Sequence, residues 1–319
     1  MTGNARGALL ALAAFGIYAS HDVIVKLLGV DYSSFQIVFF SVLFGFPLAT
    51  LMLMGDAAEE NLRPRHPWWG LARVLTTSLT GMTVFYAFSV LPLAQVYAIL
   101  FSTPLLITAL SVPLLGERVG PRRWAAVVVG LCGVLIVLRP GSAELSLGHM
   151  AALFGAVCSA LASIIVRKVG REERSVVLLL MPMLGSFLLM GAILPFVYVP
   201  MQLPGLGLVA AMSAMGFVAA WLTIRAYKSG EAVVVAPMQY SQILWAVLFG
   251  AVLFDEWPDG ATLLGAGVVI VSGLYIVLRE SRVGGSANTP VLRTRTRFET
   301  GTGLRIGPML RRRRSGDRG

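Results

Sequence analysis

The first long apolar segment of the chain contains charged residues of types that could bind a solute. Asp22 and Lys26 lie one helical turn apart, with the acid first, which is the favourable order for an ion pair. Tyr18 shares their face of a helix, so aromatic surface adjoins charge. Charge at membrane depth is costly and is a functional candidate by default. We expect Tyr18, Asp22 and Lys26 to bind substrate; the alternative is a structural pair near the outer interface, with Lys26 snorkelling.

His21 is a further titratable group of this segment, beside Asp22 and Lys26. It points about 100° away from Asp22 on the helical wheel. An imidazole titrates near neutral pH, which suits proton transfer. His21 and Asp22 are therefore the candidates for proton or ion coupling, although a lone histidine in a helix is more often a hydrogen-bonded packing residue.

Two further apolar segments, near 92–115 and 232–254, hold the densest sets of polar and aromatic side chains. Pro104 and Pro237 free backbone carbonyls there, which membranes tolerate where the backbone lines a cavity. Planar rings beside amides suit a flat organic solute with polar edges. The alternative role is hydrogen bonding between helices. The candidate binding residues in these segments are Tyr97, Thr103, Gln239, Tyr240, Gln242 and Trp245.

Other polar positions favour structural roles. Arg73 opens a threonine stripe at spacings of three and four, which is explained partly by bonds back to the helix and partly by the membrane interface. Glu117 and Glu256 follow two apolar segments and are expected to cap a helix end or form a gate contact. The small residues Gly155, Ser159 and Ser163 favour close helix packing.

The elements that carry these residues are apolar segments long enough to cross a bilayer. Hydrophobic residues make up 56% of the 319 residues and charged residues only 13%, which excludes a single water-soluble globule. A membrane span needs about 20 apolar residues. The predicted fold is an all-α polytopic membrane protein with ten transmembrane helices, near 7–28, 34–54, 68–90, 92–115, 122–138, 148–168, 175–198, 205–226, 232–254 and 260–278.

The second half of the chain repeats the first at a nearly constant offset. The segment 7–29 aligns with 148–170, and 87–117 aligns with 226–256, so that Lys26 corresponds to Arg167 and Glu117 to Glu256. Asp22 corresponds to Ser163, so the acid occurs in one half only. Five spans per half, an odd number, predict inverted-topology repeats. The expected units are a first repeat over 1–141, a second over 142–280 and a basic disordered tail over 281–319.

The net charge of +10 is concentrated at one end of the sequence. The segment 279–319 contains eleven arginines and three acidic residues, which predicts a tail that touches anionic lipid. Lysine and arginine also favour alternate connections, which predicts that both termini are cytoplasmic. A nucleic-acid partner is not expected, because the tail offers one aromatic ring, Phe298, for stacking. The chain is expected to be a monomer or homodimer.

Three stretches together resemble a known family. Leu91-Pro92-Leu93-Ala94 precedes a segment that ends Leu114-Leu115-Gly116-Glu117-Arg118, and a glycine-rich segment then ends at 133–139. This arrangement is similar to the EamA-like branch of the drug/metabolite transporter superfamily. The resemblance implies a ten-helix carrier of small organic molecules with alternating access. The first helix, with Asp22, Lys26 and then Gln36, is similar to a subset that contains riboflavin and S-adenosylmethionine carriers.

The favoured function is secondary active transport of a small organic metabolite across the cytoplasmic membrane. A flat aromatic or nucleoside-like solute such as riboflavin or S-adenosylmethionine is expected. The alternatives are an exporter of amino acids or toxic compounds, a membrane-embedded enzyme, and a channel. No enzyme activity, cofactor or metal is expected: the chain lacks a Gly-x-x-x-x-Gly-Lys-Ser/Thr nucleotide motif, and no His, Asp or Ser cluster resembles a catalytic site.

Overall fold

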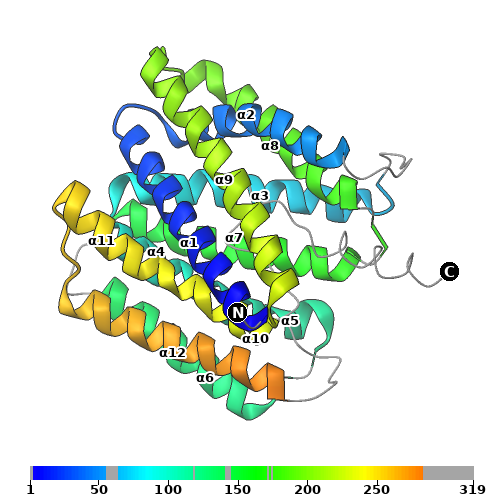
Figure 1. The fold of residues 1–319 in the computed structure, drawn as a ribbon, viewed down its shortest axis with the longest axis vertical. Helices are drawn as coiled ribbons and strands as arrows, with labels where there is room; N and C mark the ends of the chain where they lie inside the picture. Colours follow the sequence, from blue (N-terminus) through cyan, green and yellow to red (C-terminus); the bar gives the residue numbers. More distant parts are fainter. Residues whose placement is uncertain are drawn as a thin grey trace.

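A computed structural model describes residues 3–54, 64–117, 119–140, 145–170, 172–173 and 175–282. This part of the chain is helical, without a β-strand (Figure 1). The basic tail lies outside the described residues, apart from its first two positions at the end of the last helix. The helices are α1 (Gly3–Leu28), α2 (Ser34–Met54), α3 (Pro67–Val90), α4 (Leu93–Leu100), α5 (Thr103–Leu115), α6 (Pro121–Leu138), α7 (Leu147–Val169), α8 (Ser175–Val197), α9 (Leu203–Ser229), α10 (Ala232–Val235), η1 (Ala236–Ser241), α11 (Gln242–Phe254) and α12 (Gly260–Arg282).

Eight stretches of the described chain are long and apolar enough to cross a membrane. They comprise α1, the α4 and α5 unit, α6, α7, α8, α9, the η1 and α11 unit, and α12. The helices α2 and α3 fall outside this set, although both lie among the others in the bundle (Figure 1). The described part of α2 forms a shorter apolar helix, and α3 carries Arg73 and four threonines that lower its hydropathy.

The helices pack in pairs that follow the sequence repeat. The helix α1 packs along α9, and α3 packs along α7, which is the corresponding pair with the halves exchanged (Figure 1). The pair α2 and α8 and the pair α6 and α12 each join equivalent helices. Close backbone approaches repeat as well: a Cβ on Gly7 would lie 2.8 Å from Cα of Gly230, and one on Gly148 would lie 2.5 Å from Cγ2 of Val90. Glycine at both positions therefore permits the same contact in each half.

The first helices of the two halves run in opposite directions along α3. The start of α7, at Gly148, and the end of α1, at Gly29, both lie against the last residues of α3 or the turn that follows it. The end of α7, at Val169, packs instead near Trp69 at the start of α3. The bundle thus combines two halves whose equivalent helix ends lie at opposite ends of α3.

Two repeat-related helices are interrupted near the middle of the bundle. The helix α4 ends at Leu100, and α5 begins at Thr103 after a break at Phe101 and Ser102. In the second half, the 3-10 turn η1 precedes α11, and the repeat aligns Tyr240 and Ser241 with Phe101 and Ser102. Proline has no backbone N–H to donate to a helical hydrogen bond, so Pro104 and Pro237 explain why each interruption occurs close to a proline.

Candidate functional site

The interrupted helices place a buried polar cluster against α1. The carboxylate of Asp22 accepts a hydrogen bond from the hydroxyl of Tyr97, and its other oxygen lies 2.8 Å from Nδ1 of His21. The amide Nε2 of Gln242 donates to the Tyr97 hydroxyl at 3.3 Å. His21, Asp22 and Gln242 are fully buried, and Tyr97 is nearly so. We call these four residues the Asp22 cluster; it joins α1 and α4 of the first half to α11 of the second.

The hydrogen bonds among these four residues run toward the carboxylate when His21 is neutral and Asp22 is ionised. Gln242 donates to Tyr97, Tyr97 donates to Asp22, and a neutral His21 donates through Nδ1 when Asp22 is ionised. This order leaves Oε1 of Gln242 and Nε2 of His21 buried without a hydrogen-bond partner among the described residues. Buried polar atoms are nearly always satisfied, so these two atoms are positioned to meet a ligand, water or a proton.

Aromatic rings surround this cluster. The His21 imidazole lies edge-on to Phe85, with ring centroids 6.1 Å apart. The Tyr97 ring contacts Phe88 at 5.4 Å and Phe101 at 5.8 Å, and Phe101 in turn meets Tyr240 at 5.1 Å. An apolar shell excludes water and strengthens electrostatic interactions within it. The site therefore combines a carboxylate and free acceptors with flat aromatic surface.

Lys26 pairs with a residue other than the one its spacing predicts. Its Nζ lies 2.7 Å from Oε1 of Glu256 and donates to the carbonyl of Leu91 at 2.6 Å. The Phe254 ring also lies 5.2 Å from Nζ. Asp22 instead bonds to the adjacent His21, despite the separation of the two residues on the wheel. The i,i+4 rule describes an isolated helix, whereas here Tyr97 on α4 is a partner for Asp22 and Glu256 after α11 is a partner for Lys26.

The remaining candidate binding residues lie around the two helix interruptions or, for Tyr18, one turn before Asp22 on α1. Thr103 donates to the carbonyl of Leu100 and so caps the break in its own half. Tyr240 reaches α12, where its hydroxyl would lie 1.9 Å from a Cβ at Gly273, and Gln239 is half-buried in η1. Two more residues pack on neighbouring helices rather than in the Asp22 cluster: Tyr18 in a cluster with Phe15, Ala219 and Val235, and Trp245 against Gly16 and Phe249.

The threonine hydroxyls of α3 form hydrogen bonds within their own helix. Thr76, Thr77, Thr80 and Thr83 each donate to a carbonyl one turn back, as expected for hydroxyls in an apolar surrounding. The small-residue positions of α7 also act as predicted, because a Cβ on Gly155 would lie 2.6 Å from Cγ2 of Val84 on α3. The threonines are therefore satisfied within α3, and Gly155 allows close packing of α7 on α3, so neither feature indicates a ligand.

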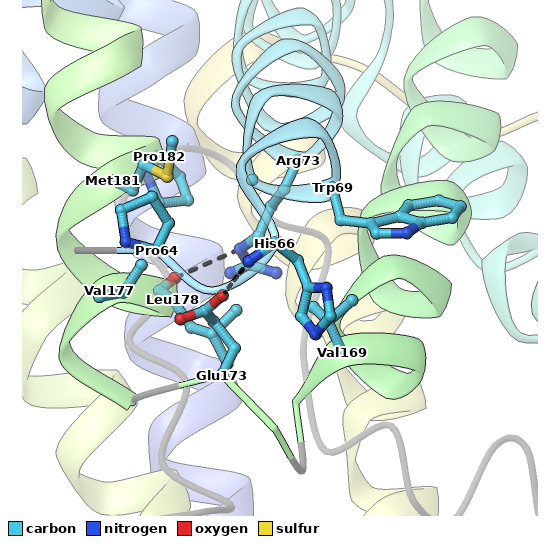
Figure 2. Close-up of a pocket in the computed structure, with 11 residues that line it drawn as sticks. Pro64, His66, Trp69, Arg73, Val169, Glu173, Val177, Leu178, Met181 and Pro182 are labelled. Carbon is cyan, nitrogen blue, oxygen red and sulfur yellow. Dashed lines mark hydrogen bonds between the residues drawn. The ribbon is translucent and has the colours of Figure 1, made fainter.

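A separate pocket lies where α3 begins beside the turn from α7 to α8 (Figure 2). Arg73 is buried there, not at a lipid-facing interface, and its Nε donates to the carbonyl of Leu178 at 3.2 Å. The carboxylate of Glu173 accepts backbone hydrogen bonds from Arg65 and His66. These contacts fasten the entry of α3 to α8, and the pocket contains none of the predicted binding residues.

Two polar contributors were not identified as site residues from the sequence. Glu256 neutralises Lys26, and its appearance in both halves of the repeat was the available signal. Gln36 holds the backbone of Val199 through two hydrogen bonds, 2.7 and 2.9 Å long, so it fixes the connection between α8 and α9. Among the residues that the structure describes, no three His, Cys, Asp or Glu side chains gather as a metal site would require.

Comparison with known proteins places this architecture in a family. The model of the EamA-like transporter family matches residues 5–139 and again residues 146–279, so the chain belongs to that family. A crystal structure shares the fold, with a TM-score of 0.58 and 18% sequence identity over 88% of this chain and 99% of that chain. The protein is therefore a multi-pass membrane transporter of a small metabolite.

Several named relatives resemble it across most of their length. An S-adenosylmethionine uptake transporter of Rickettsia bellii is 25% identical, over 83% of this chain and 90% of the relative. A riboflavin transporter of Rhizobium johnstonii is 28% identical, over 76% of this chain and 79% of the relative. The pseudopaline exporter CntI of Pseudomonas aeruginosa is 27% identical, over 87% of this chain and 97% of the relative.

Proposed function

We propose that the protein is a secondary active transporter that moves a flat, polar-edged organic metabolite across the cytoplasmic membrane by alternating access. All ten predicted spans cross the bilayer, α2 and α3 included. They form inverted halves over 1–141 and 142–280, with both termini cytoplasmic. The observation that carries the proposal is the Asp22 cluster, which joins both halves beside two interrupted helices. Secondary transporters bind solutes at such places.

The chemistry of the Asp22 cluster indicates which solute groups it binds. Gln242 Oε1 and a neutral His21 Nε2 are acceptors, so they favour a solute with N–H or O–H donors at its edge. Phe85, Phe88 and Phe101 offer rings on which a flat solute can stack. S-adenosylmethionine and riboflavin, the substrates in the names of the relatives, both combine a flat heterocycle with such donors.

Transport into sealed vesicles tests this proposal. Labelled S-adenosylmethionine and riboflavin are offered to the reconstituted protein, and unlabelled solute inside should accelerate their uptake, which a channel would not do. Asp22→Asn removes the charge of the cluster and Gln242→Ala removes the acceptor Oε1, so each should lower the rate at least about 10-fold, which corresponds to about 1.4 kcal/mol. The fold should survive, because His21 can reverse its tautomer to accept from the new amide.

The exposed residues Asp259 and Gln202 provide matched controls. Asp259→Asn repeats the change from acid to amide and Gln202→Ala repeats the glutamine truncation, both outside the Asp22 cluster. Full transport in Asp22→Asn and Gln242→Ala would contradict the site. Absence of counterflow for both solutes would reject them as substrates. Comparison of right-side-out and inverted vesicles would distinguish uptake from export, the direction in the name of CntI.

His21 and Asp22 also form the proposed proton-coupling group. When His21 is protonated, Nε2 becomes a donor and the pair with Asp22 becomes neutral overall, so one proton changes both charge and hydrogen-bonding direction. His21→Asn keeps a side chain that can hydrogen bond but cannot take up a proton. A proton gradient should accelerate uptake by the unmodified protein and leave the rate of His21→Asn unchanged. Equal acceleration of both would refute this role.

A further inference from the structure

Two ion pairs between the halves are copies of one contact. Lys26 at the end of α1 pairs with Glu256 after α11, and Arg167 at the end of α7 pairs with Glu117 after α5. The repeat aligns Lys26 with Arg167 and Glu117 with Glu256. Each half therefore supplies the base of one pair and the acid of the other. The inverted repeat thus places one such pair at each of two equivalent positions.

The two glutamates are also positioned by the same helix ending. Gly116 and Asp255 have left-handed backbones, with φ of 68° and 54°, and each precedes the pairing glutamate. The backbone N–H of Glu117 then donates to Ser111, and that of Glu256 donates to Gly250, both six residues back. This closed turn fixes where each carboxylate emerges from its helix. The two acids are thus held in equivalent places by independent pieces of the chain.

The pairs lie at opposite ends of the bundle. Nζ of Lys26 also donates to Leu91, immediately after the end of α3. The end of α7, which carries Arg167, packs through Val166 and Val169 near Trp69 at the start of α3. The 24 residues of α3 span about 36 Å, which exceeds the hydrocarbon thickness of about 30 Å. With α3 crossing the bilayer, as proposed above, one pair lies near each membrane face.

The Asp22 cluster lies between these two contacts. Asp22 precedes Lys26 by one turn of α1, so the Lys26 pair stands immediately beyond the cluster on that side. The fully buried side chains of His21, Asp22 and Gln242 show that the cluster is closed off from solvent. Both ion pairs are formed at the same time, so the structure corresponds to an occluded arrangement.

We propose that the Lys26–Glu256 and Arg167–Glu117 pairs are the two gates of the transport cycle, and that each opens while the other stays closed. This inference rests on the proposed alternating access. Inverted halves exchange their conformations between the two sides of the membrane, so a contact that closes one side must have a counterpart that closes the other. Side-chain exposures of 9% and 23% in one pair and 11% in both residues of the other let water reach the charges as a gate separates. A fully buried pair would resist separation far more strongly.

A third pair between the halves supplies the control. Arg139, which follows α6, pairs with Asp259, which precedes α12. The repeat aligns Asp259 with Gly120, so this pair has no counterpart. It joins α6 and α12, which already pack along each other, and its residues are more exposed, at 34% and 45%. Locking it should not restrict α1 or α7.

Reversible cross-linking provides the first test. In a background with Cys132→Ser and Cys158→Ala, cysteine pairs replace Lys26 and Glu256, Arg167 and Glu117, or Arg139 and Asp259. A bifunctional methanethiosulfonate links each pair, and dithiothreitol releases it. When either gate is cross-linked, we expect the exchange of labelled for unlabelled solute to fall at least 10-fold. The rate should return when dithiothreitol releases the link, which also shows that the protein is folded. Unchanged exchange with either gate linked, or an equal loss with the control linked, would overturn the proposal.

The second test needs no substrate, so it separates failure of the gates from failure of the proposed function. A Ser241→Cys reporter beside Gln242 is labelled by a membrane-impermeant thiol reagent from each side of oriented vesicles. Glu256→Gln should raise labelling several-fold from the Lys26 side, and Glu117→Gln should raise it from the other side. Asp259→Asn should change neither. A charge exchange, Lys26→Glu with Glu256→Lys, should restore the original labelling. If both glutamate variants increased labelling from the same side, or if neither increased it, the gate proposal would be overturned even if transport were intact.

Discussion

The hydroxyl of Tyr97 is the link through which Gln242 reaches Asp22, and its removal tests the Asp22 cluster directly. Tyr97→Phe keeps the ring packed against Phe88 and Phe101 while it deletes two hydrogen bonds. The bond to a carboxylate contributes about 1.5–3 kcal/mol and the neutral one about 0.5–1.5 kcal/mol. Since both partners remain buried, we expect the free energy of unfolding to fall by about 2–4 kcal/mol.

Tyr240→Phe is the matched control for this change. Tyr240 is also buried and also contacts Phe101, but its hydroxyl points to Gly273 on α12, outside the Asp22 cluster. We expect its cost to stay below about 1 kcal/mol. In detergent, unfolding followed by intrinsic fluorescence should show Tyr97→Phe melting roughly 3–6 °C lower than the unmodified protein. Melting temperatures that match those of Tyr240→Phe would refute the hydrogen-bonded cluster as described.

Two packing predictions follow from other contacts. Gly273→Ala would place Cβ 1.9 Å from the Tyr240 hydroxyl and should lower the free energy of unfolding by about 1–3 kcal/mol. Gly267→Ala on the same helix meets no described atom within 4 Å and should raise it by about 0.5–1 kcal/mol. Equal shifts of the melting temperature in the two variants would contradict the close contact at Gly273. Gln36→Leu removes two hydrogen bonds to the backbone between α8 and α9 and should lower stability by about 2–3 kcal/mol and speed proteolysis there. The exposed Gln202→Leu in the same connection should do neither.

The helical segments could be predicted from the sequence because apolar length is a local property. Each of the ten expected spans corresponds to a helix or an interrupted helical unit, and the breaks fall close to Pro104 and Pro237. Membrane crossing is a stricter condition: eight stretches meet it by length and composition, and α2 and α3 do not. Arg73 shows why composition alone does not locate a charged residue. The sequence suggests that its guanidinium lies at the membrane interface, whereas in the structure it donates to the carbonyl of Leu178 on α8.

The binding residues were harder to predict, because a helical wheel locates a residue on its own helix only. Asp22, Tyr97 and Gln242 were each selected for their chemistry, and the structure brings these three together. Tyr18 and Trp245 were selected for the same reason but pack against α9 and α1, respectively. Which polar side chains share one site depends on how the helices are rotated and paired, and those variables depend on contacts between distant segments.

The membrane class, the duplication and the correspondence of Lys26 with Arg167 and of Glu117 with Glu256 could be predicted without a structure, since they depend on residue type and spacing along the chain. The pairing of each base with the acid of the other half, in which Lys26 meets Glu256 instead of Asp22, depends on how the helices pack. The physical reason is that a buried charge takes the partner that packing brings nearest. That partner, Glu256, follows α11 and lies more than two hundred residues away in the sequence.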